Sequence, residues 1–324
     1  MIRDAKIYEF TLPLSHRMPV RTGWMLHLRT QEGRSSWSEI APLPGWSKET
    51  KEQALVQLVA MLIPIKKKPI ATSLAKILDD DTLLPSVSFG LFSGLYSLLR
   101  EDVPLRSLPL SGLLLGSHQE ILNQIPPLLQ KGVAYIKIKT SQMTATQTHS
   151  IIKQVKDRVH IRLDINKSWT PNELDFFCKS YTTSCFDYIE EPCCDLTSFC
   201  FPVALDESLR ELPPLPLENI AHLKAIVIKP TLMGVGPYVQ SLCKKAQINH
   251  WILSLSSSFE SGIGLQQIGL FSEFFQTGMD PAGLDTLKFM PYDTLLSTHT
   301  VSQGHIQWSL LHVNIDRLQE VIHV

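Results

Sequence analysis

The sequence lacks long hydrophobic runs, since none approaches the roughly 18 consecutive apolar residues that a membrane-spanning helix needs. The first residues, 1–6, carry charges, but no apolar run follows them, so we expect no secretory leader. The sequence therefore predicts a cytoplasmic protein with no membrane partner.

The sequence also lacks an excess of charge of one sign. Its 324 residues include 30 basic and 31 acidic side chains, which give a formal net charge of −1. Nucleic acids and anionic membranes are bound by clustered positive charge, whereas the only basic run here, residues 66–68, is interpreted as a solvated loop. We therefore expect no nucleic-acid partner.

The cysteine spacing of a zinc site is missing as well. Five of the six cysteines lie between Cys178 and Cys200, but this segment contains no C-x-x-C pair and no histidine. Because thiols stay reduced in the cytosol, we expect buried or idle thiols that the chemistry does not need. The six are Cys178, Cys185, Cys193, Cys194, Cys200 and Cys243.

Two parts of the chain differ in their pattern of elements. In the first hundred residues short strands precede helical stretches, which predicts an α+β unit. The predicted strands are residues 7–12, 23–29 and 36–40, and the predicted helices are residues 53–62 and 90–99. Ser47 is a candidate cap for a helix that begins near Glu49.

From about Leu108, short apolar strands alternate with helical stretches, as in a parallel sheet that is either open or closed into a barrel. No glycine-rich dinucleotide or phosphate-binding fingerprint follows these strands. The predicted strands are residues 135–139, 160–165, 188–191, 203–205, 225–229 and 251–255, with crossover helices at 144–156 and 238–246.

An ionisable residue ends each of five successive predicted strands, at intervals of about one βα unit. These residues are Lys139 (preceded by Lys137), Asp164, Glu190, Asp206 and Lys229. Taken singly, such a residue is more often a solvated strand end or part of a surface ion pair. Because the strand ends of a β/α barrel form one ring where active sites lie, five that agree favour a barrel with a functional site.

The residue types indicate the chemistry of this site. Three carboxylates with Asn166 beside them form a hard oxygen site, which suits Mg²⁺ better than zinc. Strand alternation places Arg162 and Asn166 on the same side as Asp164. Lysines that face a metal and one another are expected to have lowered pKa values, so that one can act as a base near neutral pH.

These segments resemble the successive motifs of the enolase superfamily, in its muconate-cycloisomerase branch, and most closely those of the o-succinylbenzoate synthase family. The barrel motifs are Lys137-Ile138-Lys139, Asp164-Ile165-Asn166, Ile189-Glu190-Glu191-Pro192, Asp206-Glu207-Ser208 and Ile228-Lys229-Pro230. Residues 37–45, 84–90, 256–261 and 283–287 add to the likeness.

The resemblance implies an α/β fold: a (β/α)7β modified TIM barrel at residues 106–288, an α+β capping domain at 1–105, and a C-terminal segment at 289–324 that returns to the cap. It implies Mg²⁺, with Mn²⁺ as a possible substitute, on Asp164, Glu190 and Asp206. Asn166 and Glu207 are the expected supporting residues, to which strand alternation adds Arg162. Gly23, Ser257 and Ser258, with the cap loop at 42–45, are expected to shape the substrate pocket.

The implied activity is that of a hydro-lyase acting on a small carboxylate. It would dehydrate 2-succinyl-6-hydroxy-2,4-cyclohexadiene-1-carboxylate to 2-succinylbenzoate in menaquinone biosynthesis, through a Mg-stabilised enediolate. Lys139 is the expected base and then the proton donor to the departing hydroxyl, with Lys137 helping to hold it neutral. Lys229 is expected to stabilise the enediolate from the opposite face.

Two other interpretations stay open. An N-acylamino acid racemase or dipeptide epimerase could use the same scaffold, with one lysine on each face of the substrate. A non-catalytic binding module is an alternative of another class, although every expected lysine and carboxylate is present. The sequence leaves the oligomeric state open.

Overall fold

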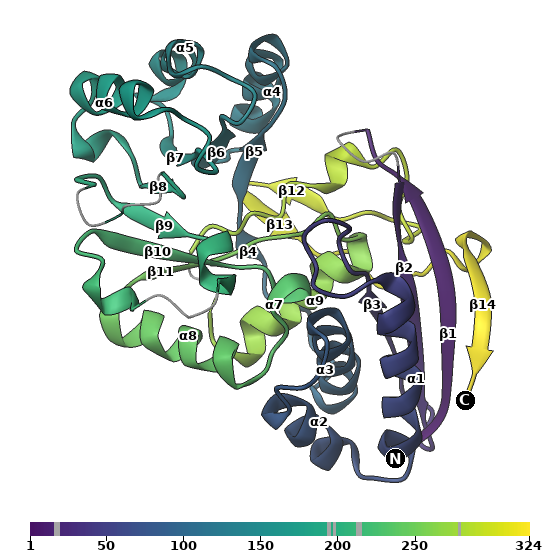
Figure 1. Cartoon of the computed structure of the whole chain (residues 1–324). Coiled ribbons are helices and arrows are strands. Elements are labelled where there is room, and N and C mark those ends of the chain that lie inside the picture. Colours follow the sequence, from purple (N-terminus) through teal and green to yellow (C-terminus); the bar gives the residue numbers. More distant parts are fainter. Residues whose placement is uncertain (16–19, 193–195, 197–198, 212–215, 278–279) are drawn as a thin grey trace.

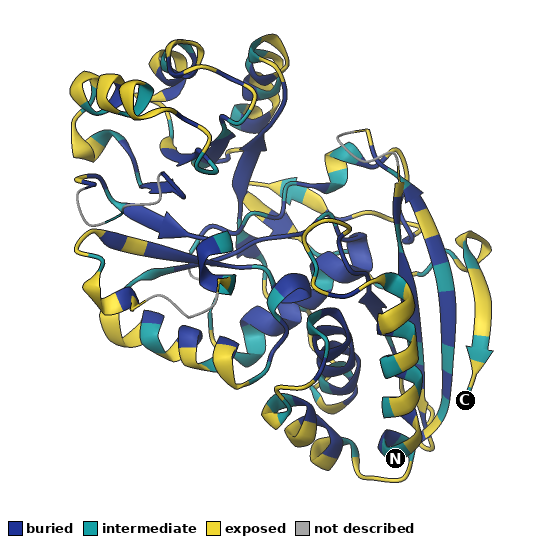
Figure 2. Ribbon diagram, in the orientation of Figure 1, coloured by how far each residue is buried: buried dark blue, intermediate teal, exposed yellow. Residues whose placement is uncertain are grey.

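The computed structural model describes residues 1–15, 20–192, 196, 199–211, 216–277 and 280–324. Figure 1 shows two parts, an antiparallel sheet with helices on the right and a set of parallel strands with helices on the left. The strands of the second part and helix α3 are buried, whereas helices α5, α6 and α8 expose their outer faces (Figure 2).

The first part is a cap built on a four-stranded antiparallel sheet in the order β14-β1-β2-β3. Its strands are β1 (Ile2–Pro13), β2 (Val20–Thr30), β3 (Ser35–Ile40) and β14 (Leu318–His323), and its helices are α1 (Lys51–Lys66), α2 (Ile70–Asp79) and α3 (Pro85–Leu99). The three strands and two helices predicted here are confirmed, while α2 was not expected. The last strand of the chain pairs with the first, along Lys6 to Phe10 of β1.

The second part is a barrel whose parallel strands are ordered β11-β10-β9-β8-β7-β6-β5. The strands are β5 (Ser111–Leu114), β6 (Tyr135–Lys139), β7 (His160–Asp164), β8 (Tyr188–Glu190), β9 (Val203–Leu205), β10 (Leu223–Ile228) and β11 (Ile252–Leu255). The helices are α4 (His118–Gln130), α5 (Ala145–Val155), α6 (Pro171–Ser180), α7 (Pro230–Met233), α8 (Pro237–Asn249) and α9 (Gly262–Phe274). A small sheet of β12 (Thr300–Ser302), β13 (His305–Gln307) and β4 (Leu108–Pro109) lies beside the barrel.

Two residues close the barrel in place of an eighth strand. Ala282 forms a parallel bridge with Leu110, just before β5, and Gly283 forms one with Ser256, just after β11. The backbone N–H of Ser111 donates to Ala282 O at 2.9 Å, and that of Gly283 donates to Leu255 O at 2.8 Å. The predicted (β/α)7β barrel with a cap is confirmed.

Local sequence signals fix where the helices begin. Helices α1, α4, α5 and α6 each start at a capping box, in which a Ser or Thr side chain and the residue three positions later satisfy each other's backbone N–H groups. For α1 the cap is Thr50, so the expectation for Ser47 is wrong. The Ser47 hydroxyl instead accepts a hydrogen bond from the Leu43 N–H at 2.8 Å, inside the cap loop.

Helix α3 joins the cap to the barrel because it packs against both. It contacts β3 on the cap side and α7 and α9 on the barrel side. Gly90 permits the close approach to β3, since a Cβ there would lie 2.4 Å from Ile40 Cγ1. An alanine at this position would push α3 and β3 apart.

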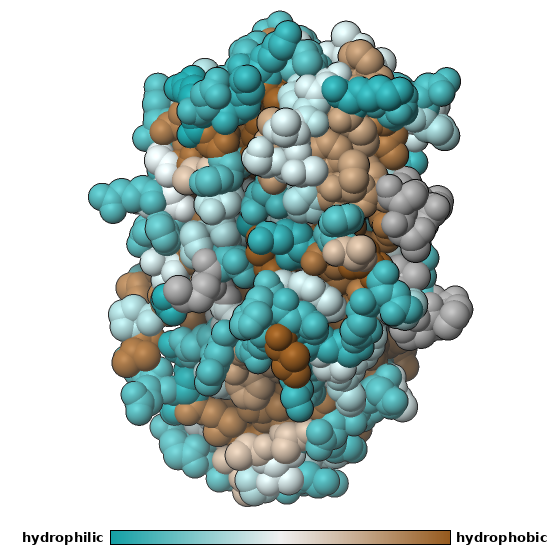
Figure 3. Space-filling view, turned by 90° about the vertical axis from the view of Figure 1, so that its left-hand side faces the viewer, coloured by the Kyte–Doolittle hydropathy of each residue, from teal (hydrophilic) through white to brown (hydrophobic). Residues whose placement is uncertain are grey.

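The outer surface is mixed in character. On the face shown in Figure 3, outside the atoms drawn in grey, hydrophobic side chains form separate patches between hydrophilic ones. Within the described part of the chain, no helix is both long enough and apolar enough to cross a membrane.

Glu39, at the end of β3, is a buried charge at the junction of cap and barrel. Its Oε2 accepts hydrogen bonds from the backbone N–H of Ser261 at 3.0 Å and from its hydroxyl at 2.5 Å. Burial raises the pKa of Glu39 to about 7, and the positive charge of Arg21 offsets only part of that effect. The cap is therefore docked through a carboxyl group that titrates near neutral pH.

The wild-type protein should lose stability as the pH rises because Glu39 must ionise, whereas the Glu39→Gln variant should not show this loss. The carboxyl group ionises near 4.5 in the unfolded chain and near about 7 in the folded protein. Folding therefore favours its protonated form, and this stabilisation is lost as the pH rises through that window. At about 1.4 kcal/mol per pKa unit, the wild type should lose on the order of 3 kcal/mol relative to Glu39→Gln.

The measurement is urea unfolding of both proteins at pH 5, 6.5 and 8. Comparing the two at each pH cancels the titration of all other groups. A difference in unfolding free energy that stays constant from pH 5 to pH 8 would contradict the assignment.

Candidate functional site

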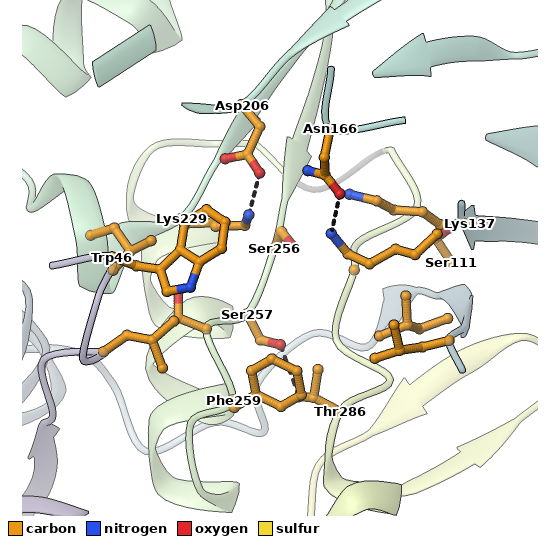
Figure 4. Close-up of a pocket in the computed structure, with 17 residues that line it drawn as sticks. Trp46, Ser111, Lys137, Asn166, Asp206, Lys229, Ser256, Ser257, Phe259 and Thr286 are labelled. Atoms are coloured by element: carbon orange, nitrogen blue, oxygen red, sulfur yellow. Dashed lines mark hydrogen bonds and ion pairs between the residues drawn. The ribbon is translucent and has the colours of Figure 1, made fainter. Parts of the chain in front are cut away.

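A cavity lies at the carboxyl ends of the barrel strands, beside the cap loop (Figure 4). The ionisable and amide side chains that line it are Lys137, Lys139, Asn166, Asp206 and Lys229. The hydroxyl side chains that line it are Ser111, Ser256, Ser257, Ser258 and Thr286. The bulky apolar side chains that line it are Leu43, Trp46, Leu113, Leu115, Leu232 and Phe259. The cavity therefore combines a charged end with a mixed apolar and hydroxyl lining.

Lysines bridge the carboxylates of neighbouring strands at the charged end. Lys137 Nζ lies 2.6 and 2.7 Å from the two oxygens of Glu190 and 3.0 Å from Asp164 Oδ2. Lys139 Nζ lies 2.7 Å from the same Asp164 oxygen. The strand register explains this, because Lys139, Asp164 and Glu190 lie side by side on β6, β7 and β8.

Lys229 comes to the cavity from another side. It directly follows β10 and contacts Asp206, which follows β9. Figure 4 shows Lys229 and Asp206 across the cavity from Asn166. Asn166 lies 3.4 Å from Lys139 Nζ, and its amide donates to Glu207 Oε1 at 3.2 Å. Two lysines from separate strands thus reach one cavity.

The charges of the site strongly perturb one another. Burial alone lowers the pKa of Lys137, but the negative charges of Asp164 and Glu190 outweigh it and hold the pKa well above its usual value. The pKa of Lys229 is raised for the same reason, with Asp206 as the main negative charge. Burial raises the pKa of Glu190 to about 8, with the neighbouring Asp164 as the next cause.

The expected lowering of the lysine pKa values assumed that the lysines face a metal, and it stays a prediction; among the protein's own groups alone, the pKa values of Lys137 and Lys229 are raised. The nearest charges to both are carboxylates, and carboxylates favour the ammonium form. Lysine repulsion contributes less, because each lysine has a carboxylate within ion-pair distance.

The donor set of the three carboxylates fits a hard cation. Asp164, Glu190 and Asp206 are buried, and Asp164 Oδ1 has no hydrogen-bond partner. Carboxylate oxygens are the ligands that Mg²⁺ prefers. In this conformation, however, no three acidic, histidine or cysteine side chains of the described residues lie close enough to hold a metal. Lys137 and Lys229 instead form ion pairs with these carboxylates. A cation would therefore compete with the two lysines for the carboxylate oxygens.

Three residues close behind the strand-end carboxylates have left-handed backbone conformations. Asn166, Lys167 and Glu191 have φ values of 50°, 54° and 46°, a region that costs free energy for residues other than glycine. Glu191 compensates by accepting hydrogen bonds from the N–H groups of Asp206 at 2.8 Å and Ser208 at 2.9 Å. Sequence reasoning gave Glu191 no role, although the adjacent pair of glutamates was a visible signal.

Arg162 does not support the carboxylate site as expected. In the strand register it is level with Lys137 and Tyr188, one layer below Asp164 and Glu190. Its guanidinium points away from the site, donating to Asp187 Oδ2 at 2.8 Å and to Pro281 O at 2.5 Å. Alternation gave the correct side of the strand but not the direction of a long side chain.

Gly23 was expected in the pocket, but it is not among the lining residues. It lies within β2, where a Cβ would meet Ala41 Cβ at 2.5 Å. Its function is therefore close packing of the cap. Ser257 and Ser258 do line the cavity, and the cap loop contributes Leu43 and Trp46. Trp46 and Thr286 were missed, since only the docked cap and the end of the barrel bring them there.

The described cysteines, Cys178, Cys185, Cys200 and Cys243, are not disulfide-bonded, and none lines the cavity. Cys193 and Cys194 lie outside the described residues. That the thiols are dispensable stays a prediction.

Comparisons with known proteins point to one family. The family described as MenC, N-terminal domain, matches residues 2–98. The o-succinylbenzoate synthase of Pasteurella multocida (strain Pm70) is 31% identical over 325 residues, which cover 91% of this chain and 92% of that protein. That of Vibrio cholerae serotype O1 (strain M66-2) is 30% identical, covering 88% and 90%. The chain belongs to the o-succinylbenzoate synthase family of the enolase superfamily.

Solved structures agree on the enolase-superfamily fold. The o-succinylbenzoate synthase of Thermosynechococcus elongatus BP-1, solved with Mg in its active site, matches with a TM-score of 0.70 and 22% identity. The match covers 91% of this chain and 97% of that one. A mandelate racemase/muconate lactonizing enzyme from Roseiflexus sp. matches with a TM-score of 0.77 and 18% identity, covering 97% and 96%.

If the three carboxylates hold a cation, Asp206→Asn should weaken Mg²⁺ binding by at least about tenfold, the lower end of what loss of a supporting residue costs a metal site. Titration calorimetry of the purified protein measures this directly. Asp175→Asn is the matched control, because it removes the carboxylate of an exposed ion pair with Lys179 on α6. Equal Mg²⁺ affinity in both variants would refute the carboxylate site.

Proposed function

We propose that the protein dehydrates 2-succinyl-6-hydroxy-2,4-cyclohexadiene-1-carboxylate to 2-succinylbenzoate, as a metal-dependent hydro-lyase of menaquinone biosynthesis acting in the cytoplasm. One observation carries the proposal: Lys139 and Lys229 reach a single cavity from separate strands, beside three buried carboxylates. Membership of the o-succinylbenzoate synthase family supports the choice of reaction.

The proposed metal is Mg²⁺, held by Asp164, Glu190 and Asp206, with Mn²⁺ as a possible substitute. When bound, it would supply positive charge next to the substrate carboxylate, where negative charge builds up once the α-proton leaves. Asn166 and Glu207 would hold this end of the site through their mutual hydrogen bond. Glu191 would fix the main chain that presents Asp206.

In the proposed reaction Lys139 removes the α-proton and then gives it to the departing hydroxyl on the same face. Lys137, held as an ammonium by Asp164 and Glu190, shares Asp164 Oδ2 with Lys139 and would help to position it. Lys229 stays protonated opposite Lys139 and stabilises the developing negative charge. Loss of water makes the ring aromatic, so the later chemistry is downhill.

Lys139→Ala should lower turnover of this substrate by about 10²- to 10⁴-fold or more, because the group serves as both base and acid. Folding and substrate binding should persist, because Lys137 Nζ still lies 3.0 Å from Asp164 Oδ2 and keeps that carboxylate paired. Steady-state kinetics with Mg²⁺, alongside circular dichroism, test this. Lys179→Ala, which removes an exposed lysine on α6, is the control. A variant that kept a tenth of the wild-type rate would overturn the role of Lys139.

A second candidate function is racemisation of N-acyl amino acids or epimerisation of dipeptides, favoured by the same pair of lysines on separate sides of the cavity. Either activity needs a proton from each face, whereas dehydration needs only the charge of Lys229. A non-catalytic binding module is disfavoured, because it would not require every lysine and carboxylate to be kept.

Lys229→Arg separates the two activities, because arginine keeps the charge but does not release its proton in proteins. We expect measurable dehydration, reduced by the larger side chain, and no deuterium incorporation into N-succinyl amino acids. Proton NMR in D₂O, with the wild type run in parallel, measures both. If dehydration vanished while deuterium incorporation persisted, the roles given to Lys139 and Lys229 would have to be reassigned.

A further inference from the structure

Glu260 is a buried carboxylate beyond the metal-type site, and it joins two segments that border the cavity. It follows Phe259 in the loop after β11, and only 1% of its surface is exposed. One oxygen accepts a hydrogen bond from the Ser258 N–H at 2.5 Å, and the other accepts one from the Thr231 hydroxyl at 2.6 Å. Residues 256–259 line the cavity and form what is here called the wall of the pocket. Glu260 therefore links this wall to the first turn of α7.

This turn of α7 fixes the main chain of Lys229. Lys229 is the residue before α7, and its carbonyl oxygen accepts from the N–H groups of Leu232 at 2.9 Å and Met233 at 3.0 Å. Thr231 is the second residue of the helix, so its bond to Glu260 ties this turn to the loop after β11. The cap helix α3 also contacts α7.

Arg21 of the cap is hydrogen-bonded to the same pocket wall. Its guanidinium is fully buried and donates to the carbonyl oxygens of Phe259 at 3.2 Å and Pro42 at 2.6 Å, and to that of Ala41. Phe259 has a φ of 60°, a strained conformation for a bulky residue that neighbouring contacts must hold. Glu260 and Glu39 supply the nearby negative charge that accompanies the buried Arg21.

The wall and Lys229 also meet at the cavity itself. Ser257, Phe259 and Lys229 border it in Figure 4, with Lys229 on the side of Asp206. A shift between the loop and α7 would therefore change where the ammonium group lies relative to anything held by the wall.

We propose that Glu260 is a positioning residue, which sets the location of Lys229 relative to the substrate-facing wall through its bonds to Thr231 and Ser258. The proposal rests on the proposed role of Lys229 in catalysis. Glu260 itself touches no reacting atom, since it is buried behind the wall and is not among the lining residues.

The experiment compares Thr231→Val with Thr231→Ser in the full chain with Mg²⁺ and the dehydration substrate. Valine has nearly the shape of threonine but no hydroxyl, whereas serine keeps the hydroxyl and loses the methyl group. We expect the valine variant to lose between about 10- and 100-fold in kcat, the scale on which small misplacements act. Its KM should stay within about twofold, because Lys229 acts on charge that develops only in the transition state. The serine variant should keep near wild-type kcat.

Three results would overturn the proposal. A higher KM at unchanged kcat would mean that the bond serves only the wall, and a lower thermal midpoint with unchanged kinetics would mean that it serves only stability. An equal loss of kcat in the serine variant would show that the missing hydroxyl is not the cause of the loss. Should the valine variant not fold, Thr231→Ala replaces it, because the space it leaves admits water to solvate Glu260.

Hydrogen–deuterium exchange separates failure of this proposal from failure of the proposed function. Peptides covering residues 226–234 and 254–262 should exchange faster together in the valine variant and not in the serine variant. This readout needs no turnover, so it decides the linkage even if the wild type does not act on the dehydration substrate. Faster exchange in only one of the two peptides would contradict the coupling.

Discussion

The compensation of buried charge at the strand ends is the constraint on which this molecule depends. Asp164, Glu190 and Asp206 are almost fully buried, and isolated carboxylates in such places carry a large desolvation cost. Three lysines from the same ring of strands supply the opposing charge within ion-pair distance. The lysines proposed to act in catalysis are thus the same groups that offset the cost of burying the carboxylates at the end of the barrel.

A second layer of polar groups lies beneath these strand ends. Arg162 and Tyr188 lie one register step lower in the barrel, where the Arg162 guanidinium donates to Asp187 and to the carbonyl oxygen of Pro281. Because Arg162 has these partners, it leaves Asp164 and Glu190 to Lys137. The barrel interior therefore holds charged groups in two register layers and is not uniformly apolar.

The sequence predicted the barrel and its charged ring because both follow from local patterns. Alternation and strand spacing suffice to bring Lys139, Asp164 and Glu190 to one level, as the register shows. The pocket walls could not be predicted in this way. Trp46 reaches the cavity and Gly23 does not, since both depend on how the cap docks onto the barrel. Arg162 shows the same limit, because side-chain direction depends on partners from distant strands.

Specificity should therefore reside where cap, barrel and C-terminal segment meet. The start of α9, in the barrel, collects acidic side chains from the other two: Glu39 of the cap accepts from the Ser261 N–H, and Asp293 of the C-terminal segment accepts from the Gly262 N–H at 2.9 Å. These bonds satisfy N–H groups that a helix leaves unpaired at its first turn, and they favour its dipole. They also hold the preceding loop, whose serines face the cavity. The two proposed activities, one-face elimination and two-face proton exchange, would use the same pair of lysines. Under either proposal, the orientation that this loop gives the substrate between Lys139 and Lys229 would decide which reaction follows.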